Sequence, residues 1–548
     1  MITHQDLGIS RRKLRALEII FGSMGWAFLI LITVVSVISI ELAGYFIVGY
    51  VFLWTIKIFG YSQRLIRAYW RLKISEIIPW KDRLKDLSEP RQALGRLEAR
   101  LQKATTFKTR SAERFYRSFL LHAIENQSSV KLPDDLWHVV MVATYNEDKA
   151  ITESTIQAII KSDYDHARTI FVLAYEQRGG PDIAKSSQAL VKQYGKHFET
   201  ALAIEHPDGI AGEVKGKGPN ITFAGRELNK LIAKKKIDPE NIILTTLDAD
   251  NRPSRHYFAY LTYRYAITED RITASFQPMA IFFNNIWDAP ALMRVIATSN
   301  SFWLLMESLR PHRLRNFSAH AQSFYALQIT DFWTVKSIVE DGHQYWRSYF
   351  AFSGQHRVVP LYCPIYQDAV LAEGYWRTFQ QQFAQLRRWA WGVSDTPYVL
   401  INMIRHKEIP LSNRIIHFFR QVEGYLSWAT APLILLMGGW LPLVLNPGSS
   451  DSILALQLPK ISQYLQTISL LGLLAPVFGA LLMLPPKPKR YGIVRRIAML
   501  VQWVFVPFSL IVFGSNAALN AQTRLALGKY LEVFNVTEKK RVDDAPEV

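Results

Sequence analysis

The chain has 548 residues, a formal net charge of +18 and a single cysteine, Cys363. This length allows two or three domains, and one cysteine excludes an internal disulfide and suits a reducing compartment. The basic excess could indicate nucleic-acid binding, but that function requires one continuous positive face. Here the Lys and Arg clusters lie beside long apolar runs, which instead favours a membrane protein.

The N-terminal part predicts a transmembrane hairpin over residues 1–61. The apolar run at 19–40 is long enough to cross a bilayer and too long for a signal peptide. A second run covers 42–56, and basic residues lie outside both runs, so both ends of the hairpin should be cytoplasmic. Residues 62–136 are basic, with Leu and Ile at helical spacing, and predict amphipathic cytoplasmic helices.

From residue 137 the pattern changes to alternating strands and helices. Helical stretches near 149–161, 182–194 and 220–236 separate apolar runs typical of strands, which cover 139–144, 169–174, 201–204, 242–247 and 272–276. This alternation predicts an α/β domain over 137–375 with a mostly parallel sheet and helices on both faces. Residues 287–308 and 376–420 are rich in Trp, Phe and Arg and predict helices in the membrane interface, or else ordinary surface helices.

Three further apolar runs, at 424–445, 468–484 and 497–513, predict C-terminal transmembrane helices over 421–520, followed by a tail at 521–548. Five spans would place the C-terminus outside, whereas Lys539, Lys540 and Arg541 favour the inside. Either the last run is re-entrant, or a sixth crossing lies around 453–465. We expect an integral, multi-pass protein of the plasma membrane whose catalytic domain is cytoplasmic.

Polar motifs follow two of the predicted strands. Asp248 and Asp250 end the run at 242–247, at the sheet edge where open α/β folds bind ligands. Two carboxylates there can hold a divalent cation on the diphosphate of a nucleotide donor, although such a pair can also simply end a strand. The motif at 144–147, Thr-Tyr-Asn-Glu, lies where a nucleotide would meet the sheet, or it caps the following helix.

A basic, glycine-containing loop with Lys217 and Asn220 opens a predicted helix. Glycines let the backbone approach phosphates, and lysines at a helix N-terminus neutralise them; a flexible basic loop is the alternative. Further on, Asp341 could serve as a general base toward an acceptor hydroxyl, or belong to an Asp-Gly turn.

The motif Gln-x-x-Arg-Trp places Gln385, Arg388 and Trp389 on one face of a helix. Trp389 offers a stacking platform for a sugar, and Arg388 can pair with a diphosphate. An aromatic and basic belt at the membrane surface is the alternative. Other reactive side chains lack metal-ligand spacing, and we interpret them as structural: Asp368, His320, His343, His356 and Cys363.

In this order, and bracketed by membrane helices, the motifs resemble those of the membrane-embedded family 2 glycosyltransferases, the group that contains cellulose and hyaluronan synthases. The resemblance covers residues 137–395 in motifs and the whole chain in layout. It implies a GT-A fold inserted between transmembrane helices, and transfer with inversion from a nucleotide-diphosphate sugar, a UDP-sugar first among these. It also implies Mg2+ or Mn2+ as cofactor.

The resemblance also implies roles for individual residues. The residues lining the nucleotide would be Thr144, Tyr145, Glu147, Lys217 and Asn220. Asp248 and Asp250 would hold the donor and the metal, and Asp341 would be the catalytic base. The diphosphate and the acceptor sugar would be contacted by Gln385, Arg388 and Trp389.

The chain departs from the family pattern at three places. Glu176 stands where members usually carry Asp-Asp or Asp-Gly, and it would take over binding of the base. Val339 replaces a Thr, and His320 stands in a loop that is usually small and contains glycine. The identity of the nucleotide base and the class of acceptor are therefore open.

The leading hypothesis is a synthase that elongates a glycan processively at the cytoplasmic face and exports it between the C-terminal helices. One alternative is transfer of a single sugar to a polyprenyl phosphate or another lipid acceptor, which the small number of spans favours. Another is a non-catalytic membrane scaffold, which the changes at Glu176 and Val339 favour. The expected partners are the donor, a glycan or lipid-linked acceptor and the lipid bilayer, without nucleic acid; accessory subunits are left open.

Overall fold

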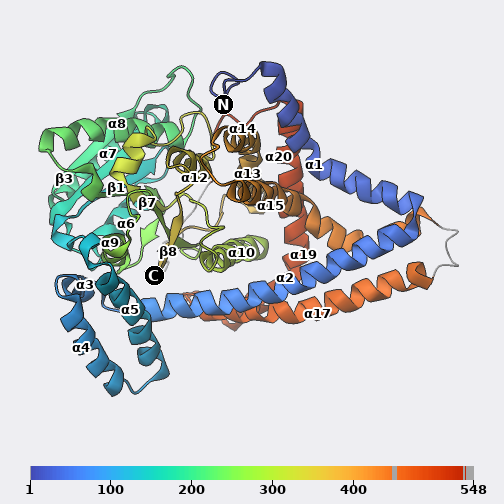
Figure 1. Ribbon diagram of the computed structural model, residues 1–548, viewed down its shortest axis with the longest axis horizontal. Helices are drawn as coiled ribbons and strands as arrows, with labels where there is room; N and C mark the ends of the chain where they lie inside the picture. The colour runs from blue at the N-terminus through green and yellow to red at the C-terminus, as the bar shows by residue number, and fades with distance from the viewer. Residues whose placement is uncertain (1, 447–452, 535–536, 538–548) are drawn as a thin grey trace.

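The computed structural model describes residues 2–446, 453–534 and 537. An α/β domain lies at one side of the molecule, and long helices project from it to a narrow end (Figure 1). The chain begins with α1 (Arg11–Ile38) and α2 (Ile40–Ser75). Ser39 separates them, and its hydroxyl caps α2 by accepting a hydrogen bond from the backbone of Leu42 (3.2 Å). Residues 62–75, expected to belong to separate cytoplasmic helices, instead extend α2.

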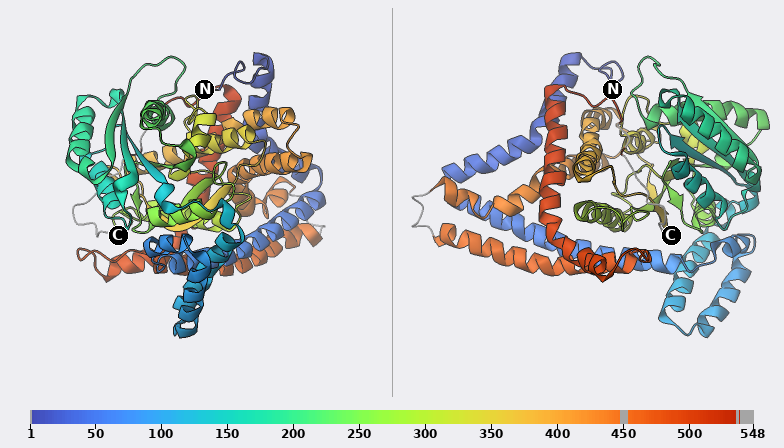
Figure 2. Two further views of the ribbon diagram at one scale, coloured as in Figure 1. Left: turned by 60° about the vertical axis from the view of Figure 1, so that its left-hand side comes forward. Right: turned by 180° about the vertical axis from the view of Figure 1, so that it is seen from behind.

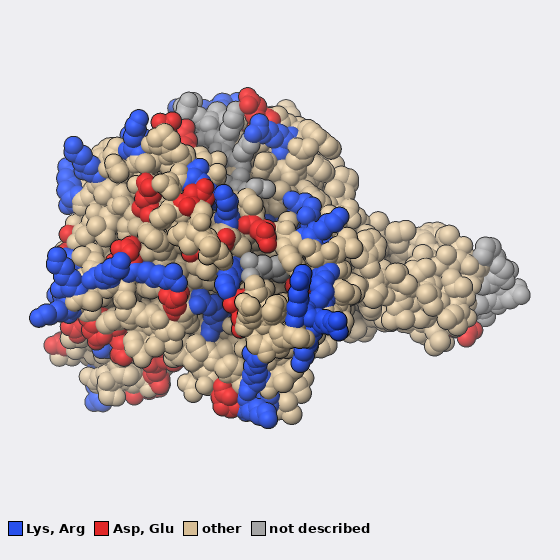
Figure 3. Space-filling model, turned by 90° about the horizontal axis from the view of Figure 1, so that it is seen from above, with Lys and Arg blue, Asp and Glu red and all other residues tan. Residues whose placement is uncertain are grey.

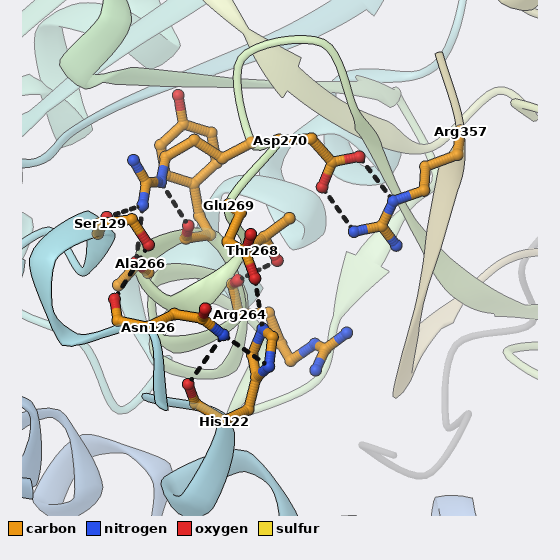
Figure 4. Close-up of polar contacts among 11 residues, drawn as sticks. His122, Asn126, Ser129, Arg264, Ala266, Thr268, Glu269, Asp270 and Arg357 are labelled. Carbon is orange, nitrogen blue, oxygen red and sulfur yellow. Dashed lines mark hydrogen bonds and ion pairs between the residues drawn. The ribbon is translucent and has the colours of Figure 1, made fainter. Parts of the chain in front are cut away.

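The remaining residues up to 136 form short helices below the sheet, α3 (Trp80–Leu84), α4 (Pro90–Lys103) and α5 (Phe107–Glu125), as the amphipathic pattern predicted. Trp80 anchors them, because its buried ring stacks on Tyr260 of the domain with 4.2 Å between ring centroids. Figure 4 shows the joint at the end of α5, with Asn126, Ser129 and Ala266 labelled. At this joint Arg271 donates to the carbonyls of Ser129 and Ala266. These contacts fix the helices to the domain.

The domain is built on one mixed sheet with strand order β3-β2-β1-β4-β7-β6-β8-β5. Strands β1 to β4 are parallel to one another, and β7 joins β4 in the antiparallel direction. The strands are β1 (Trp137–Thr144), β2 (Thr169–Glu176), β3 (Thr200–His206), β4 (Ile242–Asp248), β5 (Arg252–Pro253), β6 (Ser275–Ile281), β7 (His320–Ser323) and β8 (Val358–Tyr366). The α/β class and the first four strands are confirmed, whereas β6 begins three residues later than predicted.

Helices cover both faces of this sheet (Figure 2). The predicted helices are present as α6 (Lys149–Ile160), α7 (Pro181–Tyr194) and α8 (Lys217–Lys235), and α9 (Tyr257–Ile267) adds a fourth. Val139 and Met141 of β1 pack in one core with Leu228 of α8, and Val140 packs in a second core with Phe258 of α9. Burial on both faces explains why these strands read as continuous apolar runs.

Further helices surround the second half of the sheet and connect it to the C-terminal part. They are α10 (Ala291–Ser308), α11 (Phe324–Ile329), α12 (Glu340–Ala351), α13 (Tyr375–Ala390), α14 (Thr396–Arg405), α15 (Leu411–Met437), α16 (Leu441–Leu445), α17 (Ile453–Met483), α18 (Ile493–Val501), α19 (Val506–Ser509) and α20 (Asn516–Leu527). α20 lies beside α1 (Figure 2), where Trp26 donates to Thr523 (2.8 Å).

Four helical stretches among the described residues are long and apolar enough to cross a membrane: Arg11–Ile38, Ile40–Ser75, Leu456–Met483 and Ile493–Leu527. The predicted run at 424–445 is not among them, because a turn at 438–440 divides it between α15 and α16. Residues 453–465 belong to the same helix as 468–483, so they form no separate crossing. Lys539, Lys540 and Arg541 lie outside the described residues. Figure 3 shows that the narrow end carries few charged side chains, whereas Lys and Arg gather where it joins the broad part.

Candidate active site

The carboxyl ends of three neighbouring strands meet at one edge of the sheet. Ala143 of β1 pairs with Asp248 of β4, and Thr144 pairs with Tyr175 of β2. The polar motifs that follow β1, β2 and β4 therefore lie side by side, as the sequence predicted.

Lys217 and Asp248 form the centre of this edge. Lys217 is the first residue of α8, and its Nζ donates to Asp248 Oδ1 (2.6 Å) and to the carbonyl of Ser318 (2.9 Å). The Lys217 side chain is buried, whereas that of Asp248 is 33% exposed. Burial acts to lower the pKa of the Lys217 ammonium, but Asp248 and Glu340 outweigh it and raise the pKa. The ammonium therefore stays charged and holds Asp248 toward the open side.

Glu340 and Asp341 begin α12 and face the same ammonium group. Close packing brings α12 there: a Cβ on Gly218 of α8 would lie 3.0 Å from the Cβ of Glu340. Asp341 is only partly covered and accepts a hydrogen bond from the backbone of Gly342 (2.7 Å). Burial raises the pKa of both carboxyl groups, and the neighbouring Asp341 charge raises that of Glu340 further. Both groups therefore keep their protons to a higher pH than ordinary carboxyl groups.

Arg388 of α13 completes what we call the charged cluster: Lys217, Asp248, Glu340, Asp341 and Arg388. Burial lowers the pKa of Arg388 to about 10, against the opposing effect of the three carboxyl groups. Two cations thus face three carboxyl groups from α8, β4, α12 and α13. The structure brings together Lys217, Asp248, Asp341 and Arg388, which the sequence had singled out separately.

The C-terminal segment covers one side of this cluster, which sequence reasoning missed. Phe534 lies against the guanidinium of Arg388, 3.8 Å from ring centroid to Cζ. The backbone of Phe534 also donates to the carbonyl of Lys215 (2.7 Å), and Lys215 donates to the carbonyl of Glu532 (3.1 Å). From the sequence these residues were expected to form a tail, because no local pattern links them to a loop more than 300 residues away.

Asp250 lies behind Asp248 and is buried. Its Oδ2 accepts a hydrogen bond from the backbone of Asp368 (2.9 Å), and Asn284 donates to Asp368 Oδ1 (2.7 Å). Asp368, interpreted from the sequence as structural, thus contacts the predicted metal pair. No group of three or more His, Cys, Asp or Glu among the described residues is arranged to hold a metal. Two carboxylates suffice where phosphate oxygens of a substrate complete the coordination, as is usual for Mg2+.

The side chains expected at the nucleotide base lie along the ends of β1 and β2. Glu176 is buried and pairs with Arg178, whose Nη2 donates to Oε1 (3.1 Å) and whose guanidinium lies over the ring of Tyr145 (3.9 Å). Glu147 accepts hydrogen bonds from the Thr144 hydroxyl (3.0 Å) and from the backbone of Tyr145 (2.7 Å), and so it closes its own turn.

Asn220 ties these two strands together. Its Nδ2 donates to the carbonyl of Ala174 (3.0 Å), while its buried Oδ1 has no hydrogen-bond partner. At the ends of β2 and β3, an open recess of about 340 Å³ lies between Glu176, Arg178, His206 and the loop that contains Lys215.

Gln385 and Trp389 make their contacts elsewhere. Gln385 accepts a hydrogen bond from Gln382 of its own helix (3.0 Å), and the ring of Trp389 packs near Phe282, 6.1 Å between centroids. His320 is buried beside Lys217; its Nδ1 bonds the carbonyl of Phe317 (2.6 Å), and burial lowers its pKa to about 3. Trp333 donates to the other ring nitrogen, Nε2 (3.3 Å). A neutral ring with a hydrogen bond at each nitrogen agrees with a structural role.

Comparisons with known proteins find only distant likenesses. No family model and no curated protein matches the chain. Among solved structures, the chain is similar to the mannosyltransferase PcManGT from Pyrobaculum calidifontis in complex with GDP-Man and Mn2+, at 16% identity and a TM-score of 0.38, over 73% of this chain and 99% of that one. It is also similar to S. aureus TarS 1-349 in complex with UDP-GlcNAc, at 10% identity and a TM-score of 0.35, over 72% and 91%. Likenesses this weak assign no role to any residue.

Proposed function

We propose that this chain is a family 2 glycosyltransferase of the membrane, which transfers a sugar from a nucleotide-diphosphate sugar to a growing glycan at the cytoplasmic face. The observation that carries the proposal is the charged cluster. Two cations and three carboxyl groups converge at the sheet edge where open α/β folds bind ligands. Such an arrangement suits a reaction in which an anionic group leaves while a hydroxyl loses a proton.

Lys217 and Arg388 would bind the donor diphosphate. Lys217 lies at the N-terminus of α8, where backbone N–H groups and the helix dipole also favour a phosphate. A guanidinium can hold two phosphate oxygens at once, and both cations offset the negative charge that develops on the leaving diphosphate. Glu176, Tyr145 and the recess between Arg178 and the Lys215 loop would receive the nucleoside, with a UDP-sugar as the first candidate.

Asp248 and Asp250 would hold Mg2+ or Mn2+ on the diphosphate. Their chemistry fits a hard cation, since both are carboxylates, Asp248 being the last residue of β4 and Asp250 lying in the turn that follows. The backbone of Asp368 fixes Asp250. When bound, the ion would supply further stabilisation of the leaving group. Asp248 would also keep Lys217 in place beside it.

Asp341 would act as the general base. It is the less buried of the two acidic residues at the start of α12, so an acceptor hydroxyl can approach it. Glu340 is more deeply buried and would keep its proton. A single displacement in which Asp341 takes the proton of the attacking hydroxyl inverts the anomeric carbon, through a transition state with oxocarbenium character.

The four membrane-length stretches support placing this reaction at a bilayer. Trp389 and Gln385 would contact the acceptor sugar, and a processive enzyme would pass its product between the C-terminal helices. The acceptor, the linkage and any accessory subunit are matters for experiment.

A donor screen tests the proposal. The purified chain in nanodiscs receives radiolabelled UDP- and GDP-sugars with Mg2+ or Mn2+, beside Asp341→Asn and the surface control Asp331→Asn, and the products are sized. A long polymer from the wild type and the control, but not from Asp341→Asn, is expected. A single labelled lipid would indicate that the chain is a lipid-carrier transferase and not a polymer synthase. Absence of both transfer and nucleotide binding would contradict the proposal and favour a scaffold.

A further inference from the structure

A second positively charged group lies where α2, α10 and α15 meet. It contains six cationic side chains, which we call the arginine cluster: Lys57, Arg64, Arg310, Arg313, Arg315 and Arg420. None of them belongs to the charged cluster of the candidate active site.

Contacts between distant parts of the chain hold these cations close together. The guanidinium groups of Arg64 and Arg310 lie over one ring, that of Tyr61, at 5.1 and 5.6 Å. Arg420 donates to the carbonyl of His312 (3.0 Å), and Arg315 lies over Tyr345 (4.0 Å). The cluster is therefore preformed, so that little side-chain freedom would be lost on binding a ligand.

The carboxyl groups nearby are too few to neutralise the cluster. Glu423 pairs with Lys57 (3.0 Å) and Arg313 (3.6 Å), and Glu307 pairs with Arg310. In the part of the chain that the structure describes, no ion pair with a carboxylate is formed by Arg64, Arg315 or Arg420. The pKa of His312 is lowered by burial and by the positive charge of Arg420 and its neighbours. Like charges held this close destabilise the fold unless an anion joins them.

Exposed apolar side chains lie beside the cluster. Leu53 on α2 is 59% exposed and Ile416 on α15 is 44% exposed. Each lies four residues before a cluster cation, Lys57 and Arg420 respectively, and so shares a helix face with it. α2 is also one of the stretches long enough to cross a bilayer. A ligand at this place must therefore combine an anionic group with apolar chains, as a membrane lipid does.

We propose that the arginine cluster binds the phosphate headgroup of an anionic phospholipid. The guanidinium groups of Arg64, Arg310 and Arg420 would contact the phosphate oxygens, since arginine suits bidentate recognition of phosphate. The acyl chains would lie along the exposed apolar residues of α2 and α15. This binding site is independent of the proposed sugar transfer, and it would fix the position of the domain on the bilayer surface.

Lipid binding to the full chain in detergent, measured by native mass spectrometry, tests this site. Phosphatidylglycerol is titrated against the wild type, the double variant Arg64→Gln/Arg420→Gln and a control of equal charge, Arg91→Gln/Arg114→Gln. The control positions lie on α4 and α5, away from the cluster. Because each Lys or Arg near an anionic surface contributes about fivefold, the double variant should bind about thirtyfold more weakly, and the control should match the wild type.

Other probes separate the sources of the phosphate. Phosphatidylcholine should bind weakly and equally to all three proteins, and inorganic phosphate should not displace phosphatidylglycerol. Equal loss of binding in the two double variants would overturn the proposal, as would a preference for a polyprenyl phosphate, which would indicate a lipid-linked acceptor. If the double variant does not fold, the wild-type protein alone still tests the site. Its binding of phosphatidylglycerol should weaken as the salt concentration is raised, and binding that does not depend on salt would refute the assignment.

Discussion

Replacement of Lys217 by methionine tests whether its charge holds the candidate active site together. Methionine has a similar size but no charge, so Asp248 would lose its hydrogen bond of 2.6 Å, and Arg388 would be the one cation left to the cluster. Removing one partner of a buried ion pair costs about 3–5 kcal/mol. Because the Asp248 side chain is 33% exposed, water recovers part of this cost, and we expect about 2 kcal/mol of lost stability.

Cys363 provides the assay. It is buried in β8 and is the chain's one cysteine, so its reaction with a thiol-reactive fluorophore on heating reports unfolding of the domain. The exposed Lys230→Met on the same helix is the matched control and should change stability by less than about 0.5 kcal/mol. In the Lys217→Met background, Asp248→Asn should restore most of the loss, since the uncompensated carboxylate causes it. No recovery in the double variant would refute this reasoning.

Three further variants test other parts of the site. Glu340→Gln should raise the unfolding temperature at about pH 8.5 and change it little at about pH 5. Because the pKa of Glu340 is raised in the folded protein, folding favours the protonated carboxyl group, and stability is lost as the pH rises through this pKa. An equal effect at both pH values would contradict the raised pKa. Gly179→Ala should lower stability by about 1–3 kcal/mol, since its Cβ would lie 2.0 Å from the Tyr145 carbonyl, whereas Gly95→Ala has open space and should be tolerated. Asp250→Ala should abolish sugar transfer, and full activity that still requires metal would disprove its assignment as a ligand.

The sequence predicted the first half of the sheet well because its strands are buried on both faces. Such strands appear as unbroken apolar runs, and turn residues mark their ends. β7 was not predicted because its buried residues include a polar one, Gln322. The side-chain amide of Gln322 finds its hydrogen-bond partner on another element, where it donates to the hydroxyl of Ser348 (2.9 Å). β8 contains Pro360 and Pro364, which argue against a strand when only the sequence is known.

The sequence singled out candidate site residues where a motif carried its own chemistry. Asp248, Asp341 and Arg388 were singled out from their local motifs, and the structure places them around Lys217. Arg178 was not found, since an arginine after a strand has no pattern that distinguishes it from a surface residue. The same holds for the C-terminal segment, because tertiary contacts between distant residues leave no periodic signal.

In the proposed membrane protein, the length of α2 would set how much helix remains between the bilayer and the sheet. Its 36 residues make a rod about 54 Å long, of which a bilayer core covers about 30 Å. The part left over is rigidly joined to the sheet, because Arg71 donates to the hydroxyl of Tyr362 in β8 (2.8 Å) and Leu72 packs in the domain core. In the proposed enzyme the candidate catalytic residues would thus be fixed relative to the bilayer, and the growing glycan would move while they stay in place.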